Sequence, residues 1–147
     1  MTSSTVDPYH LERFVQAQQQ AYAAALSEVK DGRKRSHWMW YIFPQIKGLG
    51  TSPISQLYAI QDASEAKAYL HHPVLGPRLL EITDALLNVD GRTAREIFGT
   101  PDDLKLKSCA TLFASISPPD SVFEKVLTKY FNAEPDAETL RRLRRSS

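Results

Sequence analysis

The chain has 147 residues and carries 18 lysines and arginines against 17 aspartates and glutamates, a formal charge of +1. The length suits one domain, and the balanced charge excludes a whole-protein field that would steer it toward nucleic acid or an anionic membrane. Hydrophobic residues make up 42% and charged residues 24%, which excludes disordered, collagen-like and disulfide-rich chains. No apolar run approaches the roughly 18 residues that span a bilayer, and no signal peptide is recognisable. We therefore expect a cytoplasmic, single-domain protein.

The first third of the chain predicts a long helix followed by a short aromatic one. Residues 1–8 are expected to be a disordered leader, and a helix then covers residues 9–30, with Asp7 as its N-cap and a glycine ending it. The run SHWMWYIFP at 36–44 predicts a short helix that Ser36 caps and the proline stops. A strand is the alternative there, because the run is rich in aromatic residues. Helix is preferred because every neighbouring segment is helical.

The rest of the chain continues the helical pattern up to an arginine-rich end. A loop with two glycines at 45–53 leads to a short helix near 54–60, and capping residues or prolines open the helices that follow. Asp62, Thr93 and Thr100 are predicted to be three of these caps. The further segments are helices at 62–71 and 75–89, a single turn at 93–98, helices at 101–116, 121–132 and 136–144, and a basic tail at 144–147. Without an alternating strand pattern, the fold class is predicted to be all-α, one compact domain over residues 9–143 with about seven or eight helices.

The aromatic run places two kinds of side chain on two faces of one helix. The apolar face would consist of Trp38, Met39, Ile42 and Phe43. His37, Trp40 and Tyr41 would share the other face, since they lie three and four residues apart. Two rings beside a group that titrates near neutral pH suit a flat ligand. The alternative is that these rings only fill the core.

The loop after the aromatic run contains the parts of an anion site. Lys47 offers an ammonium group, Gly48 and its neighbours offer backbone amides, and Ser52 offers a hydroxyl at the start of a helix. The glycine spacing matches neither a Walker A loop nor a dinucleotide fingerprint. A plain turn is the alternative.

The predicted helix over 101–116 carries a third group of polar residues. Asp103, Lys105 and Ser108 stand out on a helix that otherwise faces the core, and Lys105 and Ser108 share a face because they lie three apart. A serine beside a lysine is one arrangement for a nucleophile. The spacing matches no such motif, so a solvated polar face is the preferred interpretation.

Three blocks of the sequence resemble the signature of the domain-of-unknown-function family 1810. They are RKRSHWMWYIFPQ at 33–45 with GLG at 48–50, YLHHPVLGPRL at 69–79 and FGTPDDLKLKS at 98–108. The chain departs from the family at 108–113, where SCATLF stands in place of the common SSMTLF, so no role is carried over for the second serine of that run. The resemblance implies a small, mostly helical protein of bacteria and fungi with no assigned reaction.

The family's blocks also contain polar and aromatic residues that core packing alone does not require. A core needs volume and hydrophobicity, not a particular lysine or glutamine. These residues are His37, Trp40, Gln45, Lys47, Asp103, Lys105 and Ser108. Their presence in the blocks favours a shared pocket.

The leading hypothesis is a pocket formed by the aromatic run, the glycine loop and the polar face of the helix after Pro101. We expect it to bind a small anionic ligand with a planar part, such as a nucleotide or an ADP-ribose-like compound. Trp40 or Tyr41 would stack on the base. Lys47, Lys105 and the backbone amides of 48–52 would hold phosphate.

A hydrolytic reaction in this pocket would need neither a metal nor a cofactor. His37 or Asp103 would act as the general acid or base. No metal site is expected, because His71 and His72 are adjacent and no ligand spacing occurs elsewhere. The single Cys109 lies on an apolar stripe, where a buried and unreactive thiol is expected.

The alternative hypothesis is a module that only binds a partner. The basic residues 33–35, the aromatic run and the arginines near the C-terminus would then form a surface for a protein or a nucleic acid, although nucleic acid is not the expected partner of a chain with this charge balance. An exposed face at Trp38 and Met39 would favour this hypothesis.

Overall fold

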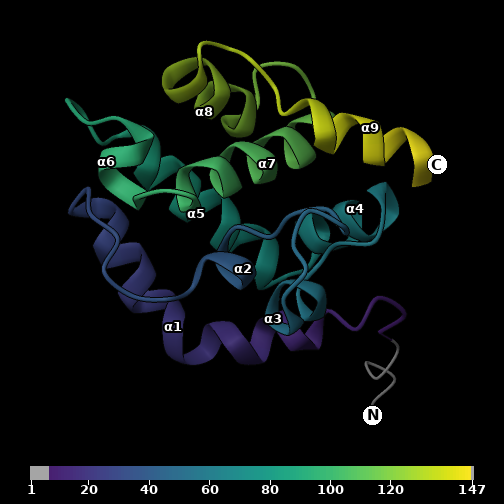
Figure 1. The fold of residues 1–147 in the computed structure, drawn as a ribbon. Coiled ribbons are helices and arrows are strands. Elements are labelled where there is room, and N and C mark those ends of the chain that lie inside the picture. Colours follow the sequence, from purple (N-terminus) through teal and green to yellow (C-terminus); the bar gives the residue numbers. More distant parts are fainter. Residues whose placement is uncertain (1–6, 147) are drawn as a thin grey trace.

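The computed structural model describes residues 7–146, with side chains up to Arg145, and its regular structure over that range is helical (Figure 1). The nine helices are α1 (Glu12–Lys30), α2 (Met39–Ile42), α3 (Pro53–Leu57), α4 (Ala63–His71), α5 (Leu75–Leu87), α6 (Ala94–Phe98), α7 (Asp102–Ser115), α8 (Val122–Phe131) and α9 (Ala137–Ser146). The predicted all-α class is confirmed, with slightly more helices than the seven or eight expected. Residues 1–6 of the expected leader lie outside the described residues, and Arg144 and Arg145 of the expected tail continue α9.

Helix α7 runs through the middle of the molecule. It packs against α6, α8, α9 and, less extensively, α4, whereas α1 packs against α5 and α2 (Figure 1). Helix α5 contacts both α1 and α8 and so joins the two sides. The short helix α2 lies between α1 and α7 in Figure 1, so its two faces meet different surroundings. None of the helices in the described range is both long and apolar enough to traverse a bilayer.

Helix α1 begins three residues later than predicted. The carboxylate of Asp7 accepts hydrogen bonds from the backbone N–H groups of Leu11 at 2.8 Å and Glu12 at 3.0 Å. His10 has a φ of +53°, which a helix does not accommodate. Asp7 therefore satisfies the first amides of the helix, as expected of a cap, but the helix starts beyond His10.

The aromatic run forms a shorter helix than expected, and Ser36 does not cap it. Residue Trp38 stands at the N-cap position and makes no side-chain cap bond. The Ser36 hydroxyl donates instead to the carboxylate of Glu28 on α1. The prediction of a Ser36 cap is wrong because a contact with another helix takes the hydroxyl away from its local role. The predicted inner face is confirmed, since the side chains of Trp38, Met39, Ile42 and Phe43 are all buried.

Capping was predicted well at two other helices and wrongly at one. Asp62 accepts from the third residue of α4, and Thr93 forms a full capping box on α6. Thr100 does not cap α7, which begins at Asp102 without a side-chain cap bond. The backbone supplies the acceptor there, because the N–H of Asp103 donates to the carbonyl of Gly99 at 2.9 Å.

Candidate functional site

A buried carboxylate from α1 holds the start of the aromatic run. Glu28 is only 6% exposed and accepts hydrogen bonds from the backbone N–H groups of Arg35 at 2.7 Å and Ser36 at 3.0 Å. It also accepts from the Ser36 hydroxyl and from Nε1 of Trp38, the latter at 3.0 Å. Burial alone would raise the pKa of Glu28, but these four hydrogen bonds outweigh burial and lower it to about 2. The carboxylate therefore stays charged and fixes Trp38 in the core.

Sequence reasoning missed Glu28, although its position contains a signal. It lies in the last turn of α1, where the helix dipole disfavours a negative charge. An acidic residue at such a place, followed by a tight turn at Gly32, suggests that the carboxylate has partners beyond the turn.

Two lysines and two tryptophans meet around one carboxylate between the aromatic run and α7. Asp102 pairs with Nζ of Lys34 at 2.9 Å and with Nζ of Lys105 at 3.0 Å. The ammonium of Lys34 lies 5.0 Å from the ring centroid of Trp38, and that of Lys105 lies 4.4 Å from the ring centroid of Trp40. Burial opposes the charge of Asp102, but the two ammonium groups hold its pKa below the ordinary value.

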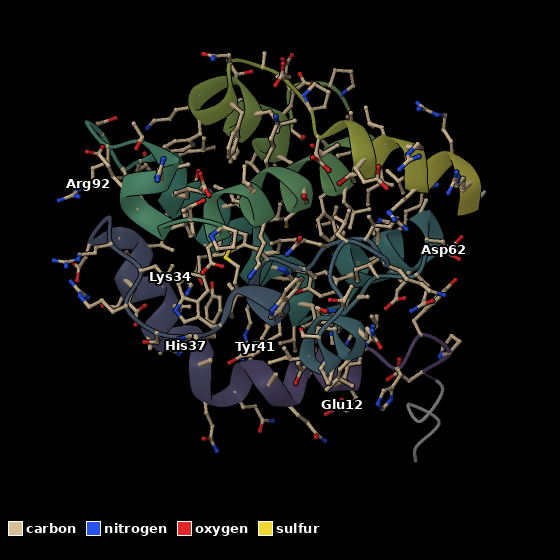
Figure 2. All side chains as sticks on the ribbon, viewed as in Figure 1. Glu12, Lys34, His37, Tyr41, Asp62 and Arg92 are labelled. Carbon is tan, nitrogen blue, oxygen red and sulfur yellow. The ribbon has the colours of Figure 1, made fainter. Side chains whose placement is uncertain are left out.

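The Trp40–Lys105 contact lies between two hollows. The smaller hollow has a volume of about 90 Å³ and the larger about 370 Å³, and Trp40 and Lys105 line both. We call the larger one the Trp40 hollow. Figure 2 shows Lys34, His37 and Tyr41 along the segment around α2, and all three line the smaller hollow. The Trp40 hollow is lined by Trp40, Gln45, Leu49, Gly50, Pro101, Leu104, Lys105, Ser108, Asp136 and Glu138.

The wall of the Trp40 hollow contains a buried amide without a partner. Gln45 is 4% exposed, and no group among the described residues accepts a hydrogen bond from its Nε2. The Ser108 hydroxyl lines the same hollow, lies within donating distance of the carbonyl of Leu104 (3.2 Å) and Oδ2 of Asp136 (3.4 Å), and can still accept. Gly50 lets the loop approach Trp40, because a Cβ there would lie 2.8 Å from Cη2 of the indole. Apolar area and unused hydrogen-bonding capacity therefore meet in one place.

The charge of this hollow does not suit an anion. Lys105 is its one cation, whereas Asp136 and Glu138 contribute two carboxylates. Asp136 caps α9 by accepting from the backbone N–H of Thr139 at 2.9 Å. Hydrogen bonding and ion pairing to Arg141 and Arg142 lower the pKa of Glu138. The lowered pKa keeps Glu138 charged at neutral pH.

A third depression, which we call the basic groove, lies on the other side of the glycine loop and has a volume of about 250 Å³. It is lined by Ile46, Lys47, Gly48, Gln61, Arg142 and Arg145. A parallel bridge fixes the chain here, because Ile60 donates to the carbonyl of Gln45 at 2.9 Å and accepts from the N–H of Lys47 at 2.8 Å. The sequence did not indicate that two arginines of α9 would join Lys47.

The predicted site residues are distributed over these three places. Trp40 and Lys105 belong to both hollows, Gln45 and Ser108 to the Trp40 hollow, His37 and Tyr41 to the smaller hollow, and Lys47 and Gly48 to the basic groove. The predicted polar face of α7 is less solvated than expected, since Ser108 is buried. Asp136, Glu138, Arg142 and Arg145 were missed.

Two predicted residues line none of these three places. The Ser52 hydroxyl accepts from the N–H of Ser55 at 3.2 Å and so caps α3. Oδ1 of Asp103 is buried and has no hydrogen-bond partner in the described part of the chain. The two residues predicted for acid–base chemistry, His37 and Asp103, are therefore not brought together in one hollow.

The surface proposed for a binding module is largely used inside the protein. Trp38 and Met39 are 2% and 4% exposed, so the exposed face that would have favoured this alternative is not formed. Lys34 lies in the ion pair with Asp102, with its side chain 8% exposed. Only Arg33 and Arg35 of the basic run stay exposed.

The thiol and the histidines show no sign of metal binding. Cys109 is buried, and burial raises the pKa of its thiol well above the ordinary value. Within residues 7–146, no three or more histidine, cysteine, aspartate or glutamate side chains are arranged to hold a metal ion. His72 instead accepts through Nδ1 from the N–H groups of Val74 and Leu75 at the start of α5.

Comparisons with other proteins agree with the family suggested by the three blocks. Residues 8–143 match the family described as "Protein of unknown function (DUF1810)". The crystal structure of the conserved hypothetical protein Rv1873 from Mycobacterium tuberculosis is similar, with 48% sequence identity and a TM-score of 0.92 over 94% of this chain and 99% of that chain. Among curated proteins, none matches this chain. The predicted resemblance and fold class are both confirmed.

Proposed function

The chain belongs to the DUF1810 family of proteins of unknown function, and we propose that it binds a small nucleotide-like ligand whose planar ring occupies the Trp40 hollow. The proposal concerns binding first and chemistry second. The proposed ligand belongs to the class expected from the sequence, but its charged part lies outside the hollow that holds the ring.

One observation carries the proposal, the unpartnered amide of Gln45 beside Trp40. A buried donor without a partner costs about 1–3 kcal/mol, and a carbonyl or ring nitrogen of a bound heterocycle would remove that cost. The Ser108 hydroxyl offers a second polar contact, and the indole of Trp40 offers stacking area. A planar ring with polar edges matches all three groups.

The anionic part of the ligand would lie outside the Trp40 hollow. Asp136 and Glu138 would repel a phosphate placed beside them, and the ammonium of Lys105 is already shared with Asp102 and Trp40. Lys47 and Gly48 line the basic groove instead. The ligand would therefore extend over the loop, with its ring on one side and its charge on the other.

Any hydrolytic step at this site would depend on His37. Its side chain is exposed and lines the smaller hollow, which shares Trp40 and Lys105 with the Trp40 hollow. Asp103 lines neither hollow, so we do not propose it as the acid or base.

Isothermal titration with adenosine, ADP and ADP-ribose tests the proposal. We expect binding to the unmodified chain and about tenfold weaker binding to Gln45→Leu, because one buried hydrogen bond is lost. Gln19→Leu is the matched control, since Gln19 is exposed on α1. Quenching of Trp40 fluorescence provides an independent readout, and Trp40→Leu should abolish it. Absence of binding by all three compounds, or equal binding by both glutamine variants, would refute the proposal.

A further inference from the structure

We infer that the basic groove is a phosphate-binding site, and that it receives the phosphate end of the ligand whose ring lies in the Trp40 hollow. The second part of this inference rests on the proposed function, whereas the first part stands on the groove alone. The groove combines residues from the glycine loop, from the chain before α4 and from α9.

The first support is an excess of positive charge among the residues that line the groove. Lys47, Arg142 and Arg145 line the groove, and no carboxylate is among its lining residues. Within the described residues, the ion pairs found do not include Lys47 or Arg145. Arg142 is ion-paired with Glu138, so Lys47 and Arg145 supply the excess positive charge of the groove, and a bound phosphate would neutralise it.

The second support is the way Arg142 is held. Its Nε lies 2.8 Å from Oε2 of Glu138, a charge contact without a hydrogen bond among the described residues, and its guanidinium lies against the glycine loop. At Gly48, a Cβ would lie 2.1 Å from Nη1 and 2.7 Å from Cζ of Arg142, and the backbone φ there is +99°. The glycine thus admits the guanidinium against the loop backbone. The terminal N–H groups of an arginine can donate two parallel hydrogen bonds to phosphate.

The third support is continuity with the Trp40 hollow. Glu138 lines the hollow and Arg142 lines the groove, one helical turn further along α9 and about 6 Å away along its axis. On the other wall, Gly50 lines the hollow and Gly48 lines the groove. A sugar between a base and a phosphate would span such a step.

The surroundings favour the phosphate of a small molecule over a nucleic-acid backbone. A polyanion lying along α9 would meet the carboxylates of Asp136 and Glu138 one turn from the groove. Arg141, another exposed cation of the helix, is already paired with Glu138. The formal charge of the whole chain is only +1.

Titration with inorganic pyrophosphate tests the groove without involving the Trp40 hollow. We compare the unmodified chain with the double variant Lys47→Gln and Arg145→Gln, both exposed positions. The control is Arg92→Gln with Lys125→Gln, which removes the same charge from exposed positions; Arg92 lies at the other end of the molecule from α9 (Figures 1 and 2). ADP, adenosine and a single-stranded oligonucleotide are titrated in parallel, and Gln45→Leu is included for each probe.

The expected result is pyrophosphate binding that weakens by about tenfold or more in the groove variant and stays unchanged in the control, because two charge-assisted hydrogen bonds are lost. ADP should bind more tightly than adenosine, and this difference in affinity should disappear in the groove variant. Gln45→Leu should leave pyrophosphate binding intact. Equal pyrophosphate binding by the groove and control variants, or no binding to the unmodified chain, would overturn the inference. An oligonucleotide that binds more tightly than ADP through the same residues would also overturn it. If adenosine binds and loses affinity in Gln45→Leu while the groove variant binds ADP normally, the inference fails and the proposed function stands.

Discussion

Two buried glutamines behave differently on either side of the aromatic run. Gln18 on α1 is 2% exposed, and its Nε2 donates to the carbonyl of Tyr41 at 2.7 Å and to the hydroxyl of Tyr69 at 2.9 Å. Gln45 is 4% exposed, yet its Nε2 has no partner among the described residues. On the α1 side, the protein satisfies its own polar groups. On the α7 side, it leaves hydrogen-bonding capacity open beside a tryptophan.

The two tryptophans show the same contrast. Trp38 is buried and donates from Nε1 to Glu28, whereas Trp40 is half-buried and lines two hollows. Substitutions on the α1 side should therefore reduce stability, and substitutions on the α7 side should mainly change binding. Four predictions test this division.

The largest effect is expected for Glu28→Ala. The change leaves the Trp38 indole N–H, two backbone amides and the Ser36 hydroxyl without their acceptor, so we expect the free energy of unfolding to fall by about 4 kcal/mol. Urea unfolding measures it. Glu12→Ala at the exposed other end of α1 is the control and should cost less than about 1 kcal/mol. Similar costs for the two variants would contradict the role assigned to Glu28.

The charge of Glu28 should also make stability depend on pH. Its pKa is about 2 in the folded protein against an ordinary value of 4.5, so the unfolded chain takes up the proton first as the pH falls. The contribution of the Glu28 charge to the free energy of unfolding is therefore complete above about pH 4.5 and is lost as the pH approaches 2. A pKa shift of this size corresponds to about 3 kcal/mol of stability. Urea titrations of the unmodified chain and of Glu28→Gln between pH 7 and 2.5 should converge at the acidic end. Parallel curves would show that Glu28 is not the group responsible.

A smaller loss of stability is expected for Gly50→Ala, together with a change at Trp40. The added Cβ would lie 2.6 Å from Cβ and Oγ of Ser55 and 2.8 Å from the indole, which we expect to cost about 2 kcal/mol. Gly91→Ala is the control: it has open space but a φ of +76°, so strain alone should cost about 1 kcal/mol. Only Gly50→Ala should shift the emission of Trp40 and weaken ligand binding. An unchanged emission spectrum in this variant would mean that the loop does not support the tryptophan.

Rules based on neighbouring residues were sufficient where the hydrogen-bond partner lies only a few positions away in the sequence. The cap at Asp62 and the capping box at Thr93 involve residues three positions apart, and both were predicted correctly. The inward face of the aromatic run was also predictable, because helical spacing alone separates Trp38 from Trp40. These features depend on distances of a few residues along the chain.

The same rules failed where the partner is remote in sequence. Ser36 has the right identity for a cap, but Glu28 binds its hydroxyl after the chain turns back at Gly32. No spacing pattern relates Gly48 to Arg142, which meet only because α9 packs on α7. The two hollows and the basic groove depend on such meetings, so the sequence indicated the residue types of the site but not how they divide among the three places.

The smallest and most discriminating effect is the change in stability caused by replacing each glutamine with leucine. Gln18→Leu should lower the free energy of unfolding by about 2 kcal/mol, because it leaves the carbonyl of Tyr41 and the hydroxyl of Tyr69 without their donor. Gln45→Leu removes a donor that had no partner, so we expect stability to stay equal or to rise by up to about 1 kcal/mol. Urea unfolding of both variants without ligand measures the difference. If Gln45→Leu makes the protein more stable and weakens binding, Gln45 is an unsatisfied group that serves the ligand. An equal loss of stability in both variants would mean instead that Gln45 is part of the core.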